Sequence, residues 1–91
     1  METTIAVYDI SGKHDAFKRE LLDLDYQEGY GYEKIKFTLP DTTVLHFNKS
    51  AKQVREEFLL IANQLGVELL RFYAQGPKDW AGIEGKPFKE K

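Results

Sequence analysis

The chain contains no cysteine, few prolines and no long run of apolar residues. Without cysteine there is no disulfide, no thiolate nucleophile and no structural zinc site with cysteine ligands. No apolar run approaches the roughly 18 residues that a membrane-spanning helix needs. Residues 1–4 also lack the basic start and apolar stretch of a signal peptide. We therefore expect a cytoplasmic protein that does not enter a membrane.

The chain also lacks a large excess of one charge, since its net charge is −2. This argues against a protein that coats nucleic acid nonspecifically, although it leaves room for a local basic patch. The 91 residues are 42% hydrophobic and rich in Phe and Tyr. We expect residues 1–84 to form one domain and residues 85–91 to form a charged C-terminal tail. A chain this short buries only about 60–65% of its unfolded surface, so a dimer would add stability.

The first part of the chain predicts a strand followed by a helix. Residues 3–9 are rich in β-branched and aromatic side chains. Because this segment is apolar on both faces, we expect it to be a central strand. Over residues 13–25, the spacing of Phe17, Leu21 and Leu24 predicts a helix that buries these three side chains on one face.

The middle of the chain predicts a loop and then a β-hairpin. Residues 26–32 contain two glycines and are expected to form a loop that leads into a strand. Charged and apolar residues alternate over residues 33–38, which is typical of a half-buried strand. Pro40 and its neighbours then signal a turn. We therefore expect residues 33–47 to form a β-hairpin, with residues 43–47 as its second strand.

The second predicted helix has the clearest signals of the chain. Ser50 and Gln53 form the pattern of a capping box at its start, and Gly66 is a suitable left-handed cap at its end. Residues 67–74 then predict a last strand. The apolar segment 80–83 can add to a sheet edge, either its own or that of a partner. Within the second predicted helix, the apolar side chains that recur at helical spacing are Val54, Phe58, Ile61 and Leu65.

The resulting order of elements is β-α-β-β-α-β. With right-handed crossovers, this order predicts an α+β fold of the ferredoxin-like type. Such a sandwich has a four-stranded antiparallel sheet with two helices on one face. The remaining face of the sheet is often where these domains pair or bind, although the fold does not decide the partner.

Asp9 is the residue whose chemical role most needs an explanation, because it places a carboxylate at the end of an apolar strand. Such a charge is costly unless it is paired, hydrated or bound to a cation. A carboxylate is a hard ligand suited to Mg²⁺, and two copies of Asp9 in a symmetric dimer would make a better metal site than one. Alternatively, Asp9 caps the following loop or the first turn of the helix.

A basic group surrounds the predicted start of the second helix. Lys49, Lys52 and Arg55 lie close together in sequence, and the free amides of a helix N-terminus attract anions. These residues are therefore candidates to bind the phosphates of a nucleic acid. The alternative is a solvated helix face, because Glu56 and Glu57 follow directly.

The histidines and the tyrosines near the glycines are weaker candidates. His14 could approach Asp9 and act as an acid or a base, whereas the alternation around His46 favours a residue on a sheet face. Three tyrosines could stack on bases or serve in packing. They are Tyr26, Tyr30 and Tyr32.

Four segments of the chain carry a family resemblance. They are Val-Tyr-Asp-Ile-Ser at 7–11, Leu-Pro-Asp-Thr-Thr-Val-Leu at 39–45, Ser-Ala-Lys-Gln-Val-Arg-Glu-Glu at 50–57 and Trp-Ala-Gly at 80–82. Together they resemble the small CRISPR-associated adaptation nuclease family, and more closely its stand-alone bacterial relatives. The resemblance covers most of residues 4–83. It implies a ferredoxin-like homodimer with Asp9 near the dimer axis, where the matching residue of the nuclease members binds a metal.

These observations lead to two functional expectations. The first is a noncatalytic homodimeric binding module for a protein or a structured nucleic acid, with Lys49, Lys52 and Arg55 as the nucleic-acid contacts. It follows from the lack of a complete catalytic set in the sequence. The alternative is a metal-dependent endonuclease, acting on RNA or DNA, that uses Mg²⁺ and Asp9 from two subunits.

Overall fold

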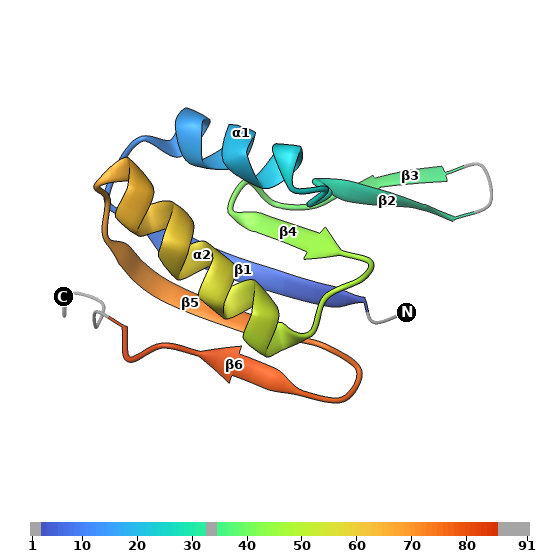
Figure 1. Ribbon diagram of the computed structural model, residues 1–91. Helices are drawn as coiled ribbons and strands as arrows, with labels where there is room; N and C mark the ends of the chain where they lie inside the picture. The colour runs from blue at the N-terminus through green and yellow to red at the C-terminus, as the bar shows by residue number, and fades with distance from the viewer. Residues whose placement is uncertain (1–2, 33–34, 86–91) are drawn as a thin grey trace, which may run out of the picture.

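The computed structural model describes residues 3–32 and 35–85. A single sheet carries two helices on one of its faces, and a two-stranded hairpin projects from the body (Figure 1). The elements in chain order are β1 (Thr4–Ile10), α1 (His14–Asp23), β2 (Gly29–Tyr32), β3 (Ile35–Thr38), β4 (Thr43–His46), α2 (Ala51–Leu65), β5 (Leu69–Gln75) and β6 (Trp80–Gly82).

The sheet has four strands in the order β4-β1-β5-β6, and all neighbours are antiparallel. This confirms the predicted α+β sandwich with a four-stranded antiparallel sheet and two helices. It also confirms that β1 is central, since β1 pairs with β4 on one side and with β5 on the other. The segment that includes β6 adds to the edge of its own sheet, beside β5.

The predicted hairpin over residues 33–47 is wrong. β3 pairs with β2 in a separate two-stranded sheet, and β4 pairs with β1. The turn after Pro40 does form, because the Thr43 amide donates to the Pro40 carbonyl at 2.9 Å. However, it carries the chain from one sheet to the other instead of folding β4 back onto β3. Residues 33 and 34 lie outside the described residues.

Gly29 explains why β3 finds its partner in the segment that was predicted to be a loop. A Cβ atom at Gly29 would lie 2.3 Å from the Phe37 carbonyl oxygen, so a larger residue would push the two strands apart. The ladder continues past β2, where the Leu39 amide donates to the Glu28 carbonyl at 2.8 Å. As a result, β6 takes the fourth place in the main sheet, which we had expected residues 33–38 to fill.

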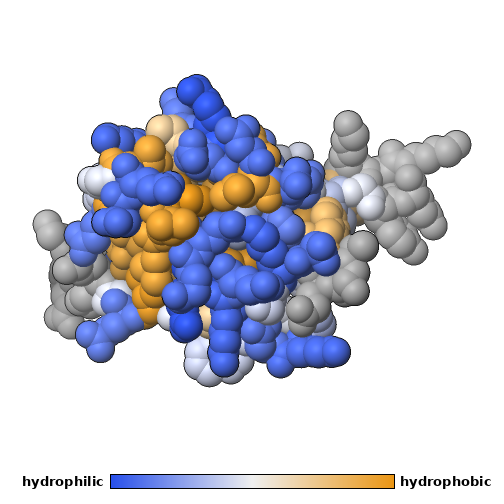
Figure 2. Space-filling model, viewed as in Figure 1, coloured by the Kyte–Doolittle hydropathy of each residue, from blue (hydrophilic) through white to orange (hydrophobic). Residues whose placement is uncertain are grey.

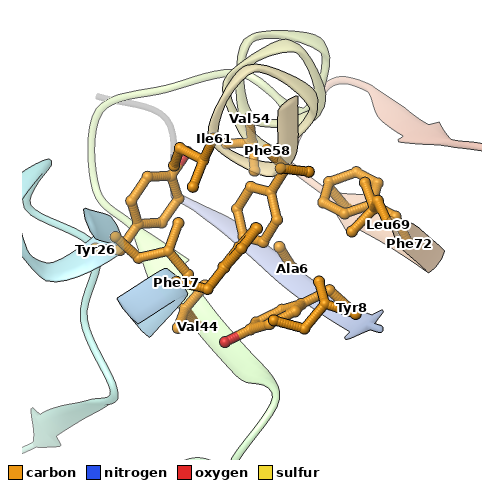
Figure 3. Packing of buried hydrophobic residues seen from close by; sticks show 14 of the residues in the cluster. Ala6, Tyr8, Phe17, Tyr26, Val44, Val54, Phe58, Ile61, Leu69 and Phe72 are labelled. Atoms are coloured by element: carbon orange, nitrogen blue, oxygen red, sulfur yellow. The ribbon is translucent and has the colours of Figure 1, made fainter. Parts of the chain in front are cut away.

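The core lies between the sheet and the two helices. Phe58 of α2 is at its centre, with ring centroids 5.1 Å from Tyr8, 5.6 Å from Phe17 and 5.0 Å from Phe72 (Figure 3). Phe17 and Leu21 bury the inner face of α1 as predicted. Leu24 does not, since the helix ends at Asp23 and Leu24 is 37% exposed at the cap position.

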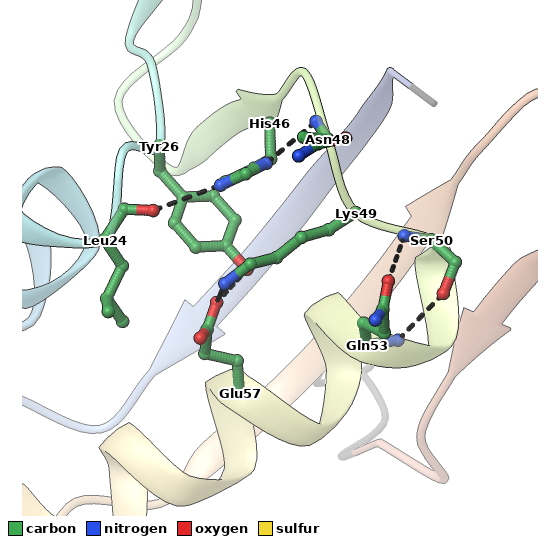
Figure 4. A network of polar contacts seen from close by, with 8 residues as sticks. All are labelled: Leu24, Tyr26, His46, Asn48, Lys49, Ser50, Gln53 and Glu57. Atoms are coloured by element: carbon green, nitrogen blue, oxygen red, sulfur yellow. Dashed lines mark hydrogen bonds and ion pairs between the residues drawn. The ribbon is translucent and has the colours of Figure 1, made fainter. Parts of the chain in front are cut away.

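The predicted ends of α2 are confirmed. The Ser50 hydroxyl accepts from the Gln53 amide at 3.3 Å, and the Gln53 side chain accepts from the Ser50 amide at 2.8 Å (Figure 4). At the other end, Gly66 has the left-handed conformation, with a φ of 70°. The two caps fix the position of α2 over the sheet, and therefore of every side chain that it presents.

Candidate interaction surfaces

The face of the sheet opposite the helices carries large apolar side chains that are exposed among the described residues. Four of them form what we call the open-face patch: Ile5, Val7, Tyr73 and Trp80, with exposed fractions of 40%, 43%, 43% and 65%. The register places Val7 directly beside Tyr73. The rings of Tyr73 and Trp80 stack, with centroids 6.3 Å apart. The patch therefore crosses three adjacent strands.

Asp9 lies on the same face, at the end of β1, and it is paired with a cation. Its Oδ2 atom accepts a hydrogen bond from the Arg71 Nε at 2.7 Å, and Arg71 is its cross-strand neighbour on β5. Asp9 therefore does not serve as the helix cap that we considered, since α1 follows Lys13 with no side-chain cap. The register with β5 shifts between Asp9 and Ile10, so the ladder is irregular at this end of β1.

Sequence reasoning missed Arg71, although a signal for it exists. Arg71 is a charged residue within the mostly apolar strand β5, just as Asp9 is within β1. Two isolated opposite charges in two apolar strands are candidates for pairing with each other, because a buried or half-buried charge needs a partner. Asp9 and Arg71 lie 62 positions apart, and only the register shows that they meet.

Asp9 remains accessible beside Arg71, because 44% of its side chain is exposed. It lines a shallow hollow on the open face. One copy of the chain offers a single carboxylate there, and this alone is not a Mg²⁺ site. In the described parts of the chain, no three His, Asp or Glu side chains lie close enough to hold a metal ion. The lining residues of the hollow include Val7, Thr43, Arg71 and Tyr73.

Lys49 points inward and does not lie beside Lys52 and Arg55, the other two candidate basic residues. Its Nζ pairs with the Glu57 Oε1 and lies 5.5 Å from the centre of the Tyr26 ring (Figure 4). The Tyr26 hydroxyl donates to the same Glu57 oxygen at 2.8 Å. Burial, followed by this bond to Glu57 and its charge, raises the pKa of Tyr26. Lys49 thus holds a network that ties α2 to the segment before β2.

The N-terminus of α2 already holds an anion from the chain itself. The Asp79 carboxylate, in the turn between β5 and β6, accepts from the Ala51 amide at 3.0 Å and from the Lys52 amide at 3.2 Å. Carboxylates are stabilised at this end of a helix by its dipole and its free amides. A phosphate would have to displace Asp79 to use the same two amides.

Lys52 and Arg55 meet two residues that the sequence had not linked with them. Both line a hollow beside β6, together with Lys78 and Trp80. Lys52 and Lys78 are exposed, and the Arg55 Nε pairs with Glu56 at 3.1 Å. The hollow thus combines basic side chains with an exposed indole ring at the free edge of the sheet.

The two histidines have separate environments. His46 is 8% exposed, and its Nδ1 accepts from the Asn48 amide at 3.0 Å, so its Nε2 carries the proton and donates to the Leu24 carbonyl at 3.1 Å (Figure 4). It lies on the covered face and packs on the Tyr26 ring. His14 is exposed and does not line the hollow that contains Asp9.

The tyrosines near the glycines also divide between core and surface. Tyr26 is a core residue at 1% exposure, which confirms the packing interpretation for this ring. Tyr30 is 43% exposed and stacks on Phe37 across the β2-β3 hairpin, with centroids 5.0 Å apart. The backbone of Tyr32 pairs with that of Ile35 in the β2-β3 ladder.

Comparison of the chain with known protein families, curated proteins and solved structures gave no match. Within residues 3–32 and 35–85, neither helix is long and apolar enough to cross a membrane. The fold and the surfaces therefore define a small α+β domain with one covered and one open sheet face, and its function has to be inferred from those surfaces.

Proposed function

We propose that the protein is a small homodimeric binding module for a structured nucleic acid, in which the open faces of two copies contact each other. The observation that carries the proposal is the open-face patch. Three of its members, Ile5, Val7 and Tyr73, lie on the two central strands, where apolar side chains are normally buried. Each large apolar side chain that becomes fully buried contributes about 1.5–3 kcal/mol.

The hollow beside β6 supports a nucleic-acid partner. Lys52, Arg55 and Lys78 supply positive charge, and the 65% exposed Trp80 supplies a ring on which a base can stack. Trp80 lies at the border between this hollow and the open-face patch, so a dimer would carry two such hollows at its margins. The resemblance of residues 4–83 to the CRISPR-associated family and its bacterial relatives agrees with a dimer of this kind.

Light scattering tests the dimer. We expect the mass of two chains at high micromolar concentration, with dissociation on dilution. The mass of a single chain at that concentration would contradict the proposal, whatever the chain binds.

Titration with duplex DNA and with folded RNA tests the partner. We expect the double variant Lys52→Gln, Lys78→Gln to bind more weakly and to lower the salt slope of the affinity by about 0.9 for each lost phosphate contact. Arg19→Gln is the matched control, because Arg19 is exposed on α1 and does not line the hollow. Failure of the wild type to bind either nucleic acid at low salt would point to a protein partner instead.

One observation favours a second candidate, the metal-dependent endonuclease. Asp9 lies on the same face as the open-face patch and keeps 44% of its side chain exposed, so a symmetric contact could bring two copies of it together. Mg²⁺ held by two carboxylates would polarise a phosphate and activate a bound water. Arg71 opposes this, because its guanidinium already neutralises the carboxylate.

Cleavage assays with and without Mg²⁺ decide this second candidate. A nuclease of this kind loses its activity in Asp9→Ala and keeps it in Asp23→Asn, which removes an exposed carboxylate from α1. Activity that survives Asp9→Ala would contradict a role for Asp9. The binding module requires no cleavage by the wild type.

A further inference from the structure

Tyr8 is a core residue whose hydroxyl group has no hydrogen-bond partner among the described residues. The residue is 5% exposed, and its ring packs on Phe17 and Phe58. Figure 3 shows its oxygen at the margin of the packed side chains, away from the ring of Phe58. The hydroxyl of a buried tyrosine usually finds a partner. No buried side-chain oxygen or nitrogen of the described residues lacks a partner, so the Tyr8 hydroxyl is accessible at a surface hollow, where water or a ligand can bind it.

The hollow lies between the start of α1, the residue before β2 and the turn between β3 and β4. Its volume is about 490 Å³, which is ample for a small polar group. It does not include Asp9 or the open-face patch, but it adjoins the hollow that contains Asp9, because Tyr8 and Thr42 line both. Its lining residues are Tyr8, His14, Asp15, Lys18, Glu28, Asp41 and Thr42.

The charges around the hollow are mainly negative. Three acidic residues, Asp15, Glu28 and Asp41, line the hollow together with one lysine, Lys18. Burial, and then the charges of Glu28 and Asp41, raise the pKa of Tyr8 to about 12. A hydroxyl in such surroundings keeps its proton and offers its lone pairs to a cation.

Lys18 shows how an ammonium group is bound in this hollow. Its Nζ lies 3.3 Å from the Glu28 Oε1 and donates to the Asp41 carbonyl at 2.6 Å. The carboxylates of Asp15 and Asp41 have no ion pair with the rest of the described chain. The hollow thus has unused negative charge beside the unpartnered Tyr8 hydroxyl.

We propose that this hollow binds a second primary ammonium group, with the Tyr8 hydroxyl as acceptor at its floor and the carboxylates of Asp15 and Asp41 at its rim. Such a group is carried by a free polyamine or by a lysine side chain of another protein. A metal ion suits the hollow less well, because no three carboxylate or imidazole groups of the described residues lie close enough to share one.

Calorimetric titration of the full chain with spermidine, and separately with a blocked Gly-Lys-Gly peptide, tests the proposal. We expect saturable binding, and Tyr8→Phe should weaken it roughly tenfold, the value of one hydrogen bond to a charged group. Tyr30→Phe is the matched control, because it removes an exposed hydroxyl outside the hollow. Tighter binding of spermidine than of the peptide identifies a polyamine site, and the reverse order identifies a lysine site.

A second pair of variants keeps the test decisive if Tyr8→Phe unfolds the protein. The double variant Asp15→Asn, Asp41→Asn changes only exposed side chains, and it should weaken binding by more than Tyr8→Phe does. Asp23→Asn removes a charge from the same helix outside the hollow and should leave binding unchanged. The proposal is overturned if neither ligand saturates the protein. It is also overturned if each control weakens binding as much as its matched variant, because the attraction would then be a general charge effect.

Discussion

The two faces of the sheet are built from similar side chains and differ in what covers them. On β1, Ala6 and Tyr8 are buried under the helices at 1% and 5% exposure, whereas Ile5 and Val7 on the other face are 40% and 43% exposed. A strand that is apolar on both faces is typical of a sheet that is buried on both faces. Both helices within residues 3–32 and 35–85 lie on one face (Figure 1). This exposure of Ile5 and Val7 is the reason for our proposal that a second copy covers the open face.

The charged groups of the two faces differ in the same way. On the covered side, Lys49, Glu57 and Tyr26 form a network around a tyrosine that is 1% exposed. On the open side, Asp9 and Arg71 keep 44% and 31% of their side chains exposed. The covered network stabilises the fold, whereas the open pair lies at the surface of the face that we propose as the dimer interface.

The comparison predicts its largest effect at Phe58. Phe58→Ala removes the ring on which the core packs and should lower the free energy of unfolding by about 3–5 kcal/mol, measured by urea denaturation. Leu60→Ala, on the same helix but 56% exposed, should change it by less than about 0.5 kcal/mol. Similar losses from the two variants would show that Phe58 is not the centre of the core.

The next effect concerns self-association. Val7→Glu places a carboxylate in the open-face patch, and it should weaken the dimer by at least about 2 kcal/mol, a roughly 30-fold increase in Kd. Analytical ultracentrifugation would measure the change. Leu60→Glu is the control for an added charge at an exposed apolar position. A dimer that Leu60→Glu breaks and Val7→Glu leaves intact would place the interface on the helices (the side shown in Figure 2).

The pH dependence of stability tests the burial of Tyr8 and Tyr26 on the covered face. Burial raises the pKa of Tyr8 to about 12 and raises that of Tyr26 as well, whereas an unfolded tyrosine ionises near pH 10. The folded state therefore keeps protons that the unfolded state loses above pH 10. We expect full stability below this pH, and above it a loss of about 1.4 kcal/mol per pH unit for each of the two tyrosines.

Unfolding experiments at pH 9 and pH 11 would check this dependence. Tyr26→Phe should make it shallower, because the variant lacks the buried hydroxyl whose pKa is raised. An equal dependence in the wild type and in Tyr26→Phe would contradict the ionisation of a buried Tyr26.

The smallest effect is expected for the open ion pair. A double-mutant cycle of Asp9→Asn and Arg71→Gln, measured at protein concentrations where the chain is monomeric, should give a coupling energy below about 1 kcal/mol, as for other exposed pairs. The coupling should shrink further in high salt. A coupling of several kcal/mol would mean that the pair is a fixed part of the fold and is not available to a partner.

The local features of the fold could be predicted from the sequence, whereas the strand pairing was only partly predictable. The capping box at Ser50 and the apolar spacing of α2 act within a few residues, and both are confirmed. The partner of β3 depends on how closely two strands approach at Gly29, which no local pattern reveals. A turn signal at Pro40 is compatible both with a hairpin and with a crossing between sheets. Which of the two forms depends on whether β4 pairs with β3 or with β1.

The candidate surfaces show the same limit. Asp9 could be singled out from the sequence because a carboxylate in an apolar strand needs a partner. Its pairing with Arg71, however, depends on the register between β1 and β5. The anion at the start of α2 is Asp79, which lies 28 positions from Ala51. In both cases the sequence identified the group that needed a partner, and the tertiary structure supplied the partner.

The most direct test of the central claim is an isotope-filtered NOE experiment on a mixture of labelled and unlabelled chains, which detects contacts between copies only. We expect intermolecular NOEs to the methyl groups of Ile5 and Val7 and to the ring of Tyr73. Intermolecular NOEs confined to the exposed leucines of the helices, or none at concentrations where the wild type should be a dimer, would contradict it.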